Sequence, residues 1–357
     1  MHKKRIEKIQ RQLAAENLDG FLVNRLVHIR YLCGYSGSSG LLIVREKDAF
    51  FLTDFRYKDQ AAKEVKGAKV IITKGDAISE LKDLKQFQGK NLRYGFESAH
   101  VTHGELQRIQ NGLAGALLVP ATDMVEQFSV IKDADEIASL QKAMDITDTA
   151  FERILGYLRP GLRENEVRAE LEYQMMTLGS EKPAFETIVA SGYRSAMPHG
   201  VASKKKIARG DFVTFDFGAM YNGYTADLTR TVVVGKASDR QRKVYNIVLR
   251  AQLAAIKKVR HGVEGKMVDK VARDIINKAG FGKNFGHGLG HGLGVYIHSK
   301  PNVGPRSTDT LKSGMVITIE PGIYISGWGG VRIEDDVLVT TRGGRVMTRS
   351  PKNLFEL

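Results

Sequence analysis

Residues 212–234, FVTFDFGAMYNGYTADLTRTVVV, decide how the second part of this 357-residue chain folds. Asn222 and Gly223 are the pair that a type I′ hairpin turn prefers, because both residues tolerate positive φ. Such a turn places Asp216 opposite Thr229, and it points Asp227 to the same sheet face, diagonal to Asp216. The stretch therefore predicts two carboxylates within reach of each other on a mostly apolar hairpin.

Two carboxylates in an apolar setting repel each other unless something neutralises them. A shared proton, a neighbouring arginine or a divalent cation would each do so. The hairpin alone does not choose among these three, so other segments have to decide.

A glycine-rich stretch, residues 285–298 (FGHGLGHGLGVYIH), supplies three of the nine histidines: His287, His291 and His298. Its glycines disfavour a regular helix and permit close approach of the backbone. The stretch fits neither of the glycine motifs that bind phosphate nor the helical H-E-x-x-H zinc motif. Histidines so concentrated favour a functional site over an incidental turn.

Two further segments, residues 316–324 (VITIEPGIY) and 330–339 (GVRIEDDVLV), each place a glutamate in an apolar, β-branched run. Glu320 stands directly before Pro321, where its strand should stop, and Glu334 follows Ile333. Four carboxylates and one imidazole favour Mn²⁺, Co²⁺, Zn²⁺ or Fe²⁺. Five ligands exceed what one catalytic ion needs, and they suit two ions about 3.5–4 Å apart.

The rest of the chain predicts two domains, 1–127 and 128–357, in keeping with its length. In the first domain, short β-like runs at 20–24, 41–45, 49–53, 70–73 and 91–95 alternate with helical patterns at 3–18, 57–66 and 77–87. This alternation indicates an α/β domain. In the second domain, helices are expected at 135–158, 164–178, 240–259 and 267–279.

Composition bounds the function. The formal net charge of +14 invites a nucleic-acid partner, but the basic residues are spread among acidic ones, and the densest cluster, Lys204 to Lys206, carries no interleaved aromatics. No secretory or membrane-spanning stretch is visible. The single cysteine, Cys33, excludes an internal disulfide and is expected to be a small buried residue. We therefore expect a cytoplasmic protein without nucleic-acid or membrane partners.

These motifs resemble the superfamily of aminopeptidase P, prolidase and methionine aminopeptidase, which has the creatinase-like, pita-bread fold. The resemblance covers most of residues 133–357, and it is consistent with a creatinase-like domain over 1–127. It implies that Asp216 chelates one metal ion, that Asp227 and Glu334 bridge two, and that His291 and Glu320 complete the second site.

The resemblance also implies roles around the metals. Glu320 would shuttle a proton, while His199 and His298 would be catalytic and contact substrate. His287 and Arg332 would bind substrate too. The sequence departs from the family pattern at Ser299, where an acidic residue is frequent, and at Arg163, where a threonine is. Ser299 affects the expected substrate pocket and leaves the expected metal ligands intact.

We therefore predict an α+β protein: a pita-bread catalytic domain behind a smaller α/β creatinase-like domain. The predicted activity is metal-dependent hydrolysis of the Xaa-Pro bond in short proline-containing peptides, as a dipeptidase (prolidase) or a small aminopeptidase. Two divalent ions, Mn²⁺ ahead of Co²⁺ or Zn²⁺, and a homodimer are expected. The alternative is a catalytically inactive pita-bread protein that only binds its partners, as in relatives that have lost metal ligands.

Overall fold

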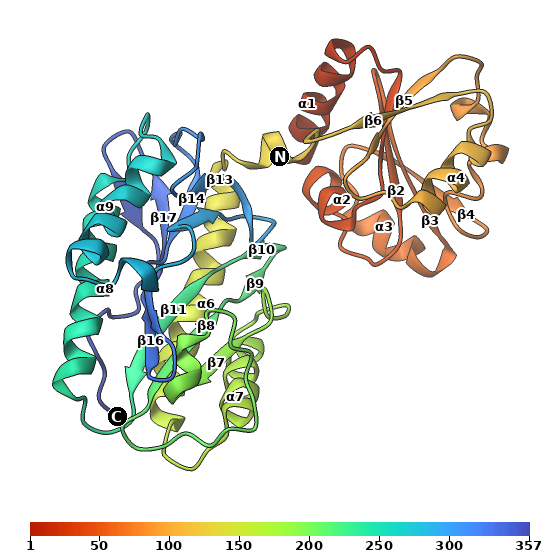
Figure 1. The fold of residues 1–357 in the computed structure, drawn as a ribbon. Helices are drawn as coiled ribbons and strands as arrows, with labels where there is room; N and C mark the ends of the chain where they lie inside the picture. The colour runs from red at the N-terminus through yellow and green to blue at the C-terminus, as the bar shows by residue number, and fades with distance from the viewer. The chain divides into compact units, whose positions relative to one another are not determined.

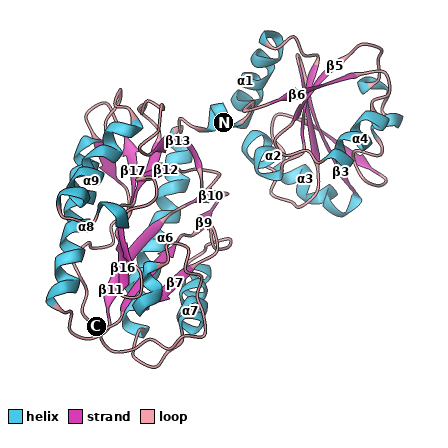
Figure 2. Cartoon of the chain, in the orientation of Figure 1, coloured by secondary structure: helices cyan, strands magenta, loops and turns pink.

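The computed structural model describes residues 1–357 and divides them into two compact units, Met1–Ser129 and Val130–Leu357. Figure 1 follows the chain through both units, and Figure 2 shows that each one combines strands with helices. No helix is both long enough and apolar enough to cross a membrane.

Unit 1 is built on one mixed six-stranded sheet with the order β4-β3-β2-β1-β5-β6. The β1–β2 and β2–β3 pairs are antiparallel, and the other three are parallel. The strands are β1 (Gly20–Val23), β2 (Leu41–Arg45), β3 (Ala49–Asp54), β4 (Lys69–Thr73), β5 (Arg93–Glu97) and β6 (Leu117–Ala121). The five predicted strands are therefore present, and the sequence reading missed β6.

The helices of unit 1 are α1 (His2–Ala15), α2 (Leu26–Cys33), α3 (Lys58–Glu64), α4 (His103–Gly112) and the short α5 (Glu126–Ser129). The apolar stripe predicted for the first helix is real, because Ile6, Ile9 and Leu13 are buried. Cys33 is buried as well, and burial raises the pKa of its thiol to about 12. Such a thiol stays protonated and is no nucleophile, as expected.

The helix predicted at 77–87 is wrong. The structure has two short 3₁₀ turns there, at Leu81–Asp83 and Lys85–Phe87. Its core-facing residues, Ile78, Leu81, Leu84 and Phe87, recur every three positions, and a 3₁₀ turn aligns side chains at i and i+3. The carboxylates of Asp76 and Glu80 accept local backbone N–H groups instead of leaving them to a helix.

Unit 2 carries its strands in two main sheets, ordered β11-β8-β7 and β13-β12-β14-β17-β18, and in two hairpins, β9-β10 and β15-β16. The first sheet and its hairpin are β7 (Ile188–Ser191), β8 (Phe212–Phe217), β9 (Met220–Tyr221), β10 (Tyr224–Thr225) and β11 (Leu228–Val233). The others are β12 (Gly290–Gly292), β13 (Ser299–Val303), β14 (Val316–Ile319), β15 (Gly322–Ile325), β16 (Gly329–Arg332), β17 (Asp335–Val339) and β18 (Gly344–Val346).

Four long helices flank these strands, two on each side (Figure 1). They are α6 (Ala134–Tyr157), α7 (Glu164–Thr177), α8 (Asp239–Lys258) and α9 (Gly265–Lys278), close to the predicted positions. The first pair packs with β7, β8 and β11, and the second pair packs with β14, β16 and β17. Each pair of helices thus buries one apolar layer of strands, and the polar residues of the candidate site lie between the two layers.

The hairpin predicted within residues 212–234 is confirmed. Asn222 and Gly223 have φ values of 51° and 78°, as a type I′ turn requires. Strands β8 and β11 are antiparallel, with Thr229 opposite Asp216. Asp227 stands just before β11, so both aspartates come from one hairpin.

Candidate active site

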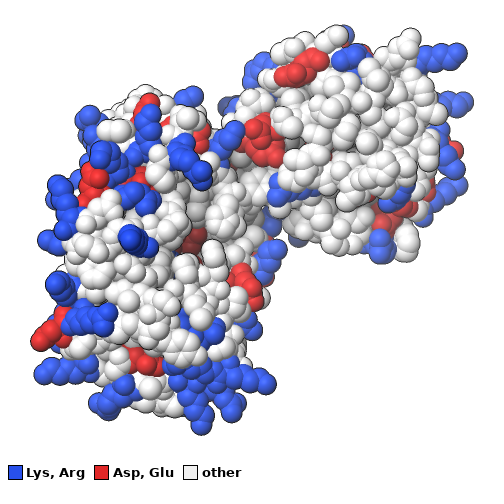
Figure 3. All heavy atoms as spheres, viewed as in Figure 1, with Lys and Arg blue, Asp and Glu red and all other residues white.

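Unit 2 contains an open cavity of about 1100 Å³. All nine predicted site residues line it: His199, Asp216, Asp227, His287, His291, His298, Glu320, Arg332 and Glu334. Figure 3 shows acidic atoms recessed in a hollow on this face of the unit, among uncharged atoms. The fold thus gathers residues that are spread over more than a hundred positions of the sequence.

Strand ends and junctions position the acidic residues. Asp216 lies on β8 and Asp227 just before β11, while Glu320 lies between β14 and β15. Glu334 occupies the junction of β16 and β17. Within a continuous strand, successive side chains point to opposite faces of the sheet. Side chains at strand ends and junctions are less bound by this alternation, so several of them can point to one place.

His291 lies on β12, where the backbone is crowded. A Cβ atom on Gly290 would stand 2.1 Å from the Thr318 carbonyl oxygen, and one on Gly292 would stand 2.0 Å from that of Lys300. No side chain fits at those distances, so glycine is required on both sides of the histidine. The close approach predicted from the glycine-rich stretch is therefore present.

Three ligand atoms form a tight group: one each from Asp227, His291 and Glu334, all within 4.8 Å of one another. The His291 Nε2 atom lies 3.7 Å from Asp227 Oδ2 and 3.4 Å from Glu320 Oε1. A hydrogen bond of 3.2 Å between His291 Nδ1 and the Gly292 carbonyl turns Nε2 toward the carboxylates. Burial lowers the pKa of His291 to about 4, so its imidazole is neutral, as a metal ligand must be.

The carboxylates carry more negative charge than the protein compensates. Burial raises the pKa of Asp227 and of Glu334 well above the usual range, and the neighbouring acids raise both further. Burial also raises the pKa of Glu320 to about 8, against the opposing effect of Arg332. Acids this close together take up protons unless a cation replaces them.

Glu334 gives a direct test of whether a cation fits. Its Oε1 atom is buried and has no hydrogen-bond partner, whereas Oε2 accepts a hydrogen bond of 2.7 Å from the Thr229 hydroxyl. A buried carboxylate oxygen without a partner is costly in a finished protein interior. Together with four acids and a neutral imidazole, this open oxygen fits a divalent metal ion.

Asp216 is held differently, because the Arg332 guanidinium hydrogen-bonds to its Oδ2 atom. The sequence left arginine and metal open as alternative ways to neutralise the aspartate pair. The structure places an arginine on Asp216, while Asp227 lies in the three-atom group. Asp216 and Glu320 thus border that group without belonging to it.

The histidines expected to meet substrate divide into two kinds. His199 and His298 are exposed and line the cavity. His287 is more enclosed, and burial together with Arg332 lowers its pKa to about 4. Its Nε2 atom lies 2.9 Å from the hydroxyl of Tyr324, which also accepts a 2.9 Å hydrogen bond from Arg332.

Sequence reasoning missed the residues that hold the site together. Tyr324 stood in the quoted IEPGIY segment without a role. The Thr318 hydroxyl donates to Glu320 Oε1 over 3.2 Å and accepts from the His291 N–H over 3.1 Å. Asp336 accepts the Asp227 N–H over 3.0 Å and has a second, unpartnered oxygen. The one signal available in the sequence was a polar residue inside an apolar strand. Such a residue can be noticed, but the sequence does not show which side chain it hydrogen-bonds to.

Fold and site together are those of a metal-dependent hydrolase. Residues 138–341 match metallopeptidase family M24, and residues 5–131 match the creatinase/prolidase N-terminal domain. The chain belongs to metallopeptidase family M24. The predicted superfamily and the α+β pita-bread fold behind a creatinase-like domain are confirmed.

Individual relatives match over the whole chain. An Xaa-Pro dipeptidase of Pyrococcus furiosus is 39% identical over 99% of this chain and 100% of its own length. The solved structure of an Xaa-Pro dipeptidase from Bacillus anthracis is 42% identical, with a TM-score of 0.95 and full coverage of both chains. An X-Pro aminopeptidase structure from Thermotoga maritima is 38% identical, with a TM-score of 0.90 and coverage of 97% and 100%.

Proposed function

We propose that this protein is an Xaa-Pro dipeptidase with two divalent metal ions held by Asp216, Asp227, His291, Glu320 and Glu334. The observation that carries the proposal is the convergence of these five side chains on one cavity, with Glu334 Oε1 buried and unpartnered. The names of the full-length relatives support the substrate class. With all five ligands present, nothing favours a binding protein that has lost catalysis.

The donor set fits Mn²⁺, with Co²⁺ and Zn²⁺ as the other candidates, because carboxylates dominate over the single imidazole. When bound, such a pair of cations lowers the pKa of a water molecule and polarises a carbonyl. Two cations also offset the four carboxylates, which relieves the repulsion that raises the pKa values of Asp227 and Glu334.

The side chains around the ligands have distinct tasks in this proposal. Glu320 accepts a proton from the attacking water and passes it to the leaving amine. His199 and His298, which line the cavity as exposed side chains, contact the substrate and stabilise the developing oxyanion. His287 and Arg332 form the adjoining wall, which Tyr324 holds in place through its two hydrogen bonds.

Selectivity for proline has to come from the cavity, because neither water activation nor carbonyl polarisation requires it. A tertiary amide offers no N–H, so a cavity wall that needs no N–H from the substrate accepts proline after the scissile bond. A residue with a longer side chain at that position clashes with the wall. Lys283 and Arg306 line the same cavity, are exposed, and make no ion pair or hydrogen bond. These two unpaired, positively charged side chains favour a substrate whose carboxylate belongs to the proline residue itself. Such a substrate is a dipeptide.

Matched substrates test this function. Protein loaded with Mn²⁺ should cleave Ala-Pro at least about 100-fold better than Ala-Ala in kcat/KM, a difference near 2.7 kcal/mol in transition-state binding. It should also prefer Ala-Pro to Ala-Pro-Ala. Equal rates on Ala-Pro and Ala-Ala would remove the proline specificity, and a preference for the tripeptide would make the enzyme an aminopeptidase. Homodimerisation and cytoplasmic location stay predictions from the sequence.

A further inference from the structure

We infer that Thr229 is a positioning residue: its hydroxyl sets the direction of the Glu334 carboxylate and links it to the Arg332–Asp216 pair. This inference rests on the proposed metal centre. It concerns a side chain that is fully buried in the middle of the site, with no exposed surface. Thr229 has no ligand role of its own.

Two hydrogen bonds converge on the Thr229 hydroxyl. Arg332 Nε donates to Oγ1 over 3.0 Å, and Oγ1 donates to Glu334 Oε2 over 2.7 Å. A guanidinium can only donate, so the hydroxyl has to accept on that side. Its single proton is therefore directed at Glu334.

The consequence for Glu334 is an asymmetry between its two oxygens. Oε2 has a fixed donor, while Oε1 is buried without one. With Oε2 held, rotation of the carboxylate about its last bond is restrained, so the oxygen that Glu334 contributes to the three-atom group with Asp227 and His291 keeps its place. The free oxygen is thus kept ready for a cation.

The same hydroxyl connects the two halves of the ligand set. Arg332 uses its Nη2 atom on Asp216 and its Nε atom on Thr229. The orientation of Asp216, on β8, is thereby tied to that of Glu334, beyond β16. Removing one hydroxyl leaves both the guanidinium Nε and the carboxylate Oε2 without their partners.

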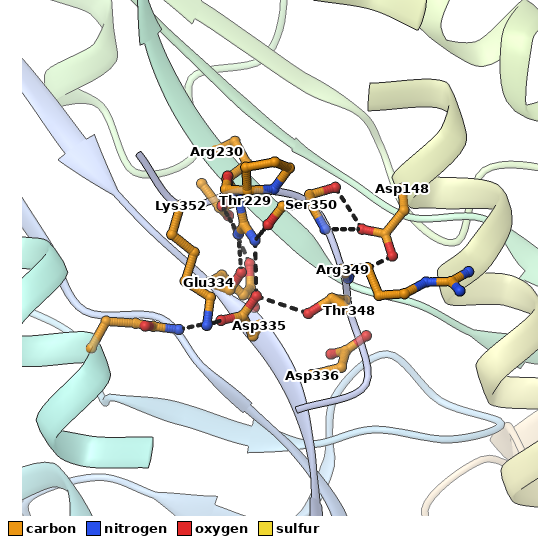
Figure 4. A network of polar contacts seen from close by, with 12 residues as sticks. Asp148, Thr229, Arg230, Glu334, Asp335, Asp336, Thr348, Arg349, Ser350 and Lys352 are labelled. Atoms are coloured by element: carbon orange, nitrogen blue, oxygen red, sulfur yellow. Dashed lines mark hydrogen bonds and ion pairs between the residues drawn. The ribbon is translucent and has the colours of Figure 1, made fainter. Parts of the chain in front are cut away.

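The backbone around Thr229 is held independently of its side chain (Figure 4). The Glu334 N–H donates to the Thr229 carbonyl over 3.1 Å, and Arg230 donates to the carbonyls of both residues. Arg230 also pairs with Asp335 at 2.9 Å and donates to the carbonyls of Ser350 and Pro351. Loss of the Thr229 hydroxyl therefore leaves this frame in place and isolates the side-chain effect.

The test compares Thr229→Val, which keeps the shape and removes the hydroxyl, with Thr229→Ser, which keeps the hydroxyl. The readout is the Mn²⁺ dissociation constant of the metal-free protein, measured by calorimetry without substrate. Loss of the partner that orients a ligand weakens metal binding about 10- to 100-fold. We expect a loss in that range for Thr229→Val and a change below about threefold for Thr229→Ser.

Thr231→Val is the matched control. Thr231 is a buried threonine two residues along the same strand, and its hydroxyl contacts the main chain of Arg332 and the Thr214 hydroxyl but no carboxylate. It should keep wild-type metal affinity. If Thr229→Val does not fold, Thr229→Ala, which adds no methyl group against the guanidinium, is judged by the same criterion.

Unchanged Mn²⁺ affinity in the Thr229→Val protein would overturn the inference while leaving the proposed function standing. Equal losses in Thr229→Val and Thr231→Val would also overturn it, because they would show a general packing effect. A wild-type protein that binds no divalent cation would overturn the proposed function itself.

Discussion

At the scale of single residues, Asp227 has the most demanding position in the site. It is buried against Glu334, Asp216, Asp336 and Glu320, and each of these acids raises its pKa further. A carboxylate so placed destabilises the metal-free protein and stabilises the metal-bound one. The two effects of Asp227 therefore have opposite signs and can be measured separately.

We predict that Asp227→Asn loses nearly all activity with its fold intact. Without metal the variant should melt at a higher temperature than the wild type, because folding no longer has to bury or protonate this carboxylate against its unfavourable surroundings. With metal it should lose the rise in melting temperature that binding gives the wild type. Melting curves with and without Mn²⁺ measure both.

The control for this prediction is Asp274→Asn. Asp274 forms a surface pair with Lys270 and is 44% exposed, so its removal should change little. Turnover of Asp227→Asn within about tenfold of wild type, roughly 1.4 kcal/mol of barrier, would show that Asp227 is not a ligand.

Much of the site could be predicted at this scale, since Asp216, Asp227, His291, Glu320 and Glu334 stand out as polar residues in apolar or glycine-rich runs. Their convergence on one cavity follows from motifs that a sequence displays directly. The partners of these residues do not. Thr229, Thr318 and Tyr324 act through contacts with residues distant in the sequence, and such contacts exist only once the strands are paired.

At the scale of elements, the start of α6 shows how a helix end can disfavour the charged form of a buried side chain. Lys132 lies just before the N-cap residue Asp133, is 6% exposed, and donates to the Val130 carbonyl over 3.0 Å. Burial lowers the pKa of this lysine to about 8, although Glu136 opposes the shift. The positive end of the α6 dipole also disfavours a cation there.

The sign of the pH effect follows from linkage. Between pH 8 and the ordinary lysine value of 10.5, the unfolded chain keeps a proton that the folded protein has lost, so stability rises with pH in that window. Below pH 8 the buried charge costs about 3 kcal/mol, from about 1.4 kcal/mol per pKa unit.

We therefore predict that Lys132→Met is more stable than the wild type at pH 7. The advantage should shrink as the pH rises from 8 toward 10, because the wild-type lysine becomes neutral in that range. Melting temperatures of both metal-free proteins at pH 7, 8, 9 and 10 measure it. An advantage that stays constant or grows across this range would contradict the account.

The four long helices of unit 2 were predicted from the sequence, whereas α2 and α4 of unit 1 were not. The helices α6, α7, α8 and α9 follow the apolar pattern of an α-helix, and the structure places them within a few residues of the prediction. The stretch 77–87 repeats its apolar residues every three positions. This spacing is close to that of an α-helix, although the chain forms 3₁₀ turns there. Strand β6 has a weakly buried pattern and gave no comparable signal.

At the scale of the whole molecule, the chain joins a creatinase-like unit to a catalytic unit that holds the entire candidate site. Every residue lining the main cavity belongs to Val130–Leu357. Metal binding should therefore be a property of that unit. The number of cations bound there is decisive, because five ligands suit two ions whereas the tight group of Asp227, His291 and Glu334 alone would suit one.

The most direct test is anomalous difference density in crystals of the full-length protein loaded with Mn²⁺. We predict two peaks about 3.5–4 Å apart, bridged by carboxylates and ringed by all five ligands. Asp216 can reach the second ion through Oδ1, because its contact with Arg332 uses Oδ2. A single peak held by Asp227, His291 and Glu334, with Asp216 still on Arg332, would contradict the dinuclear centre.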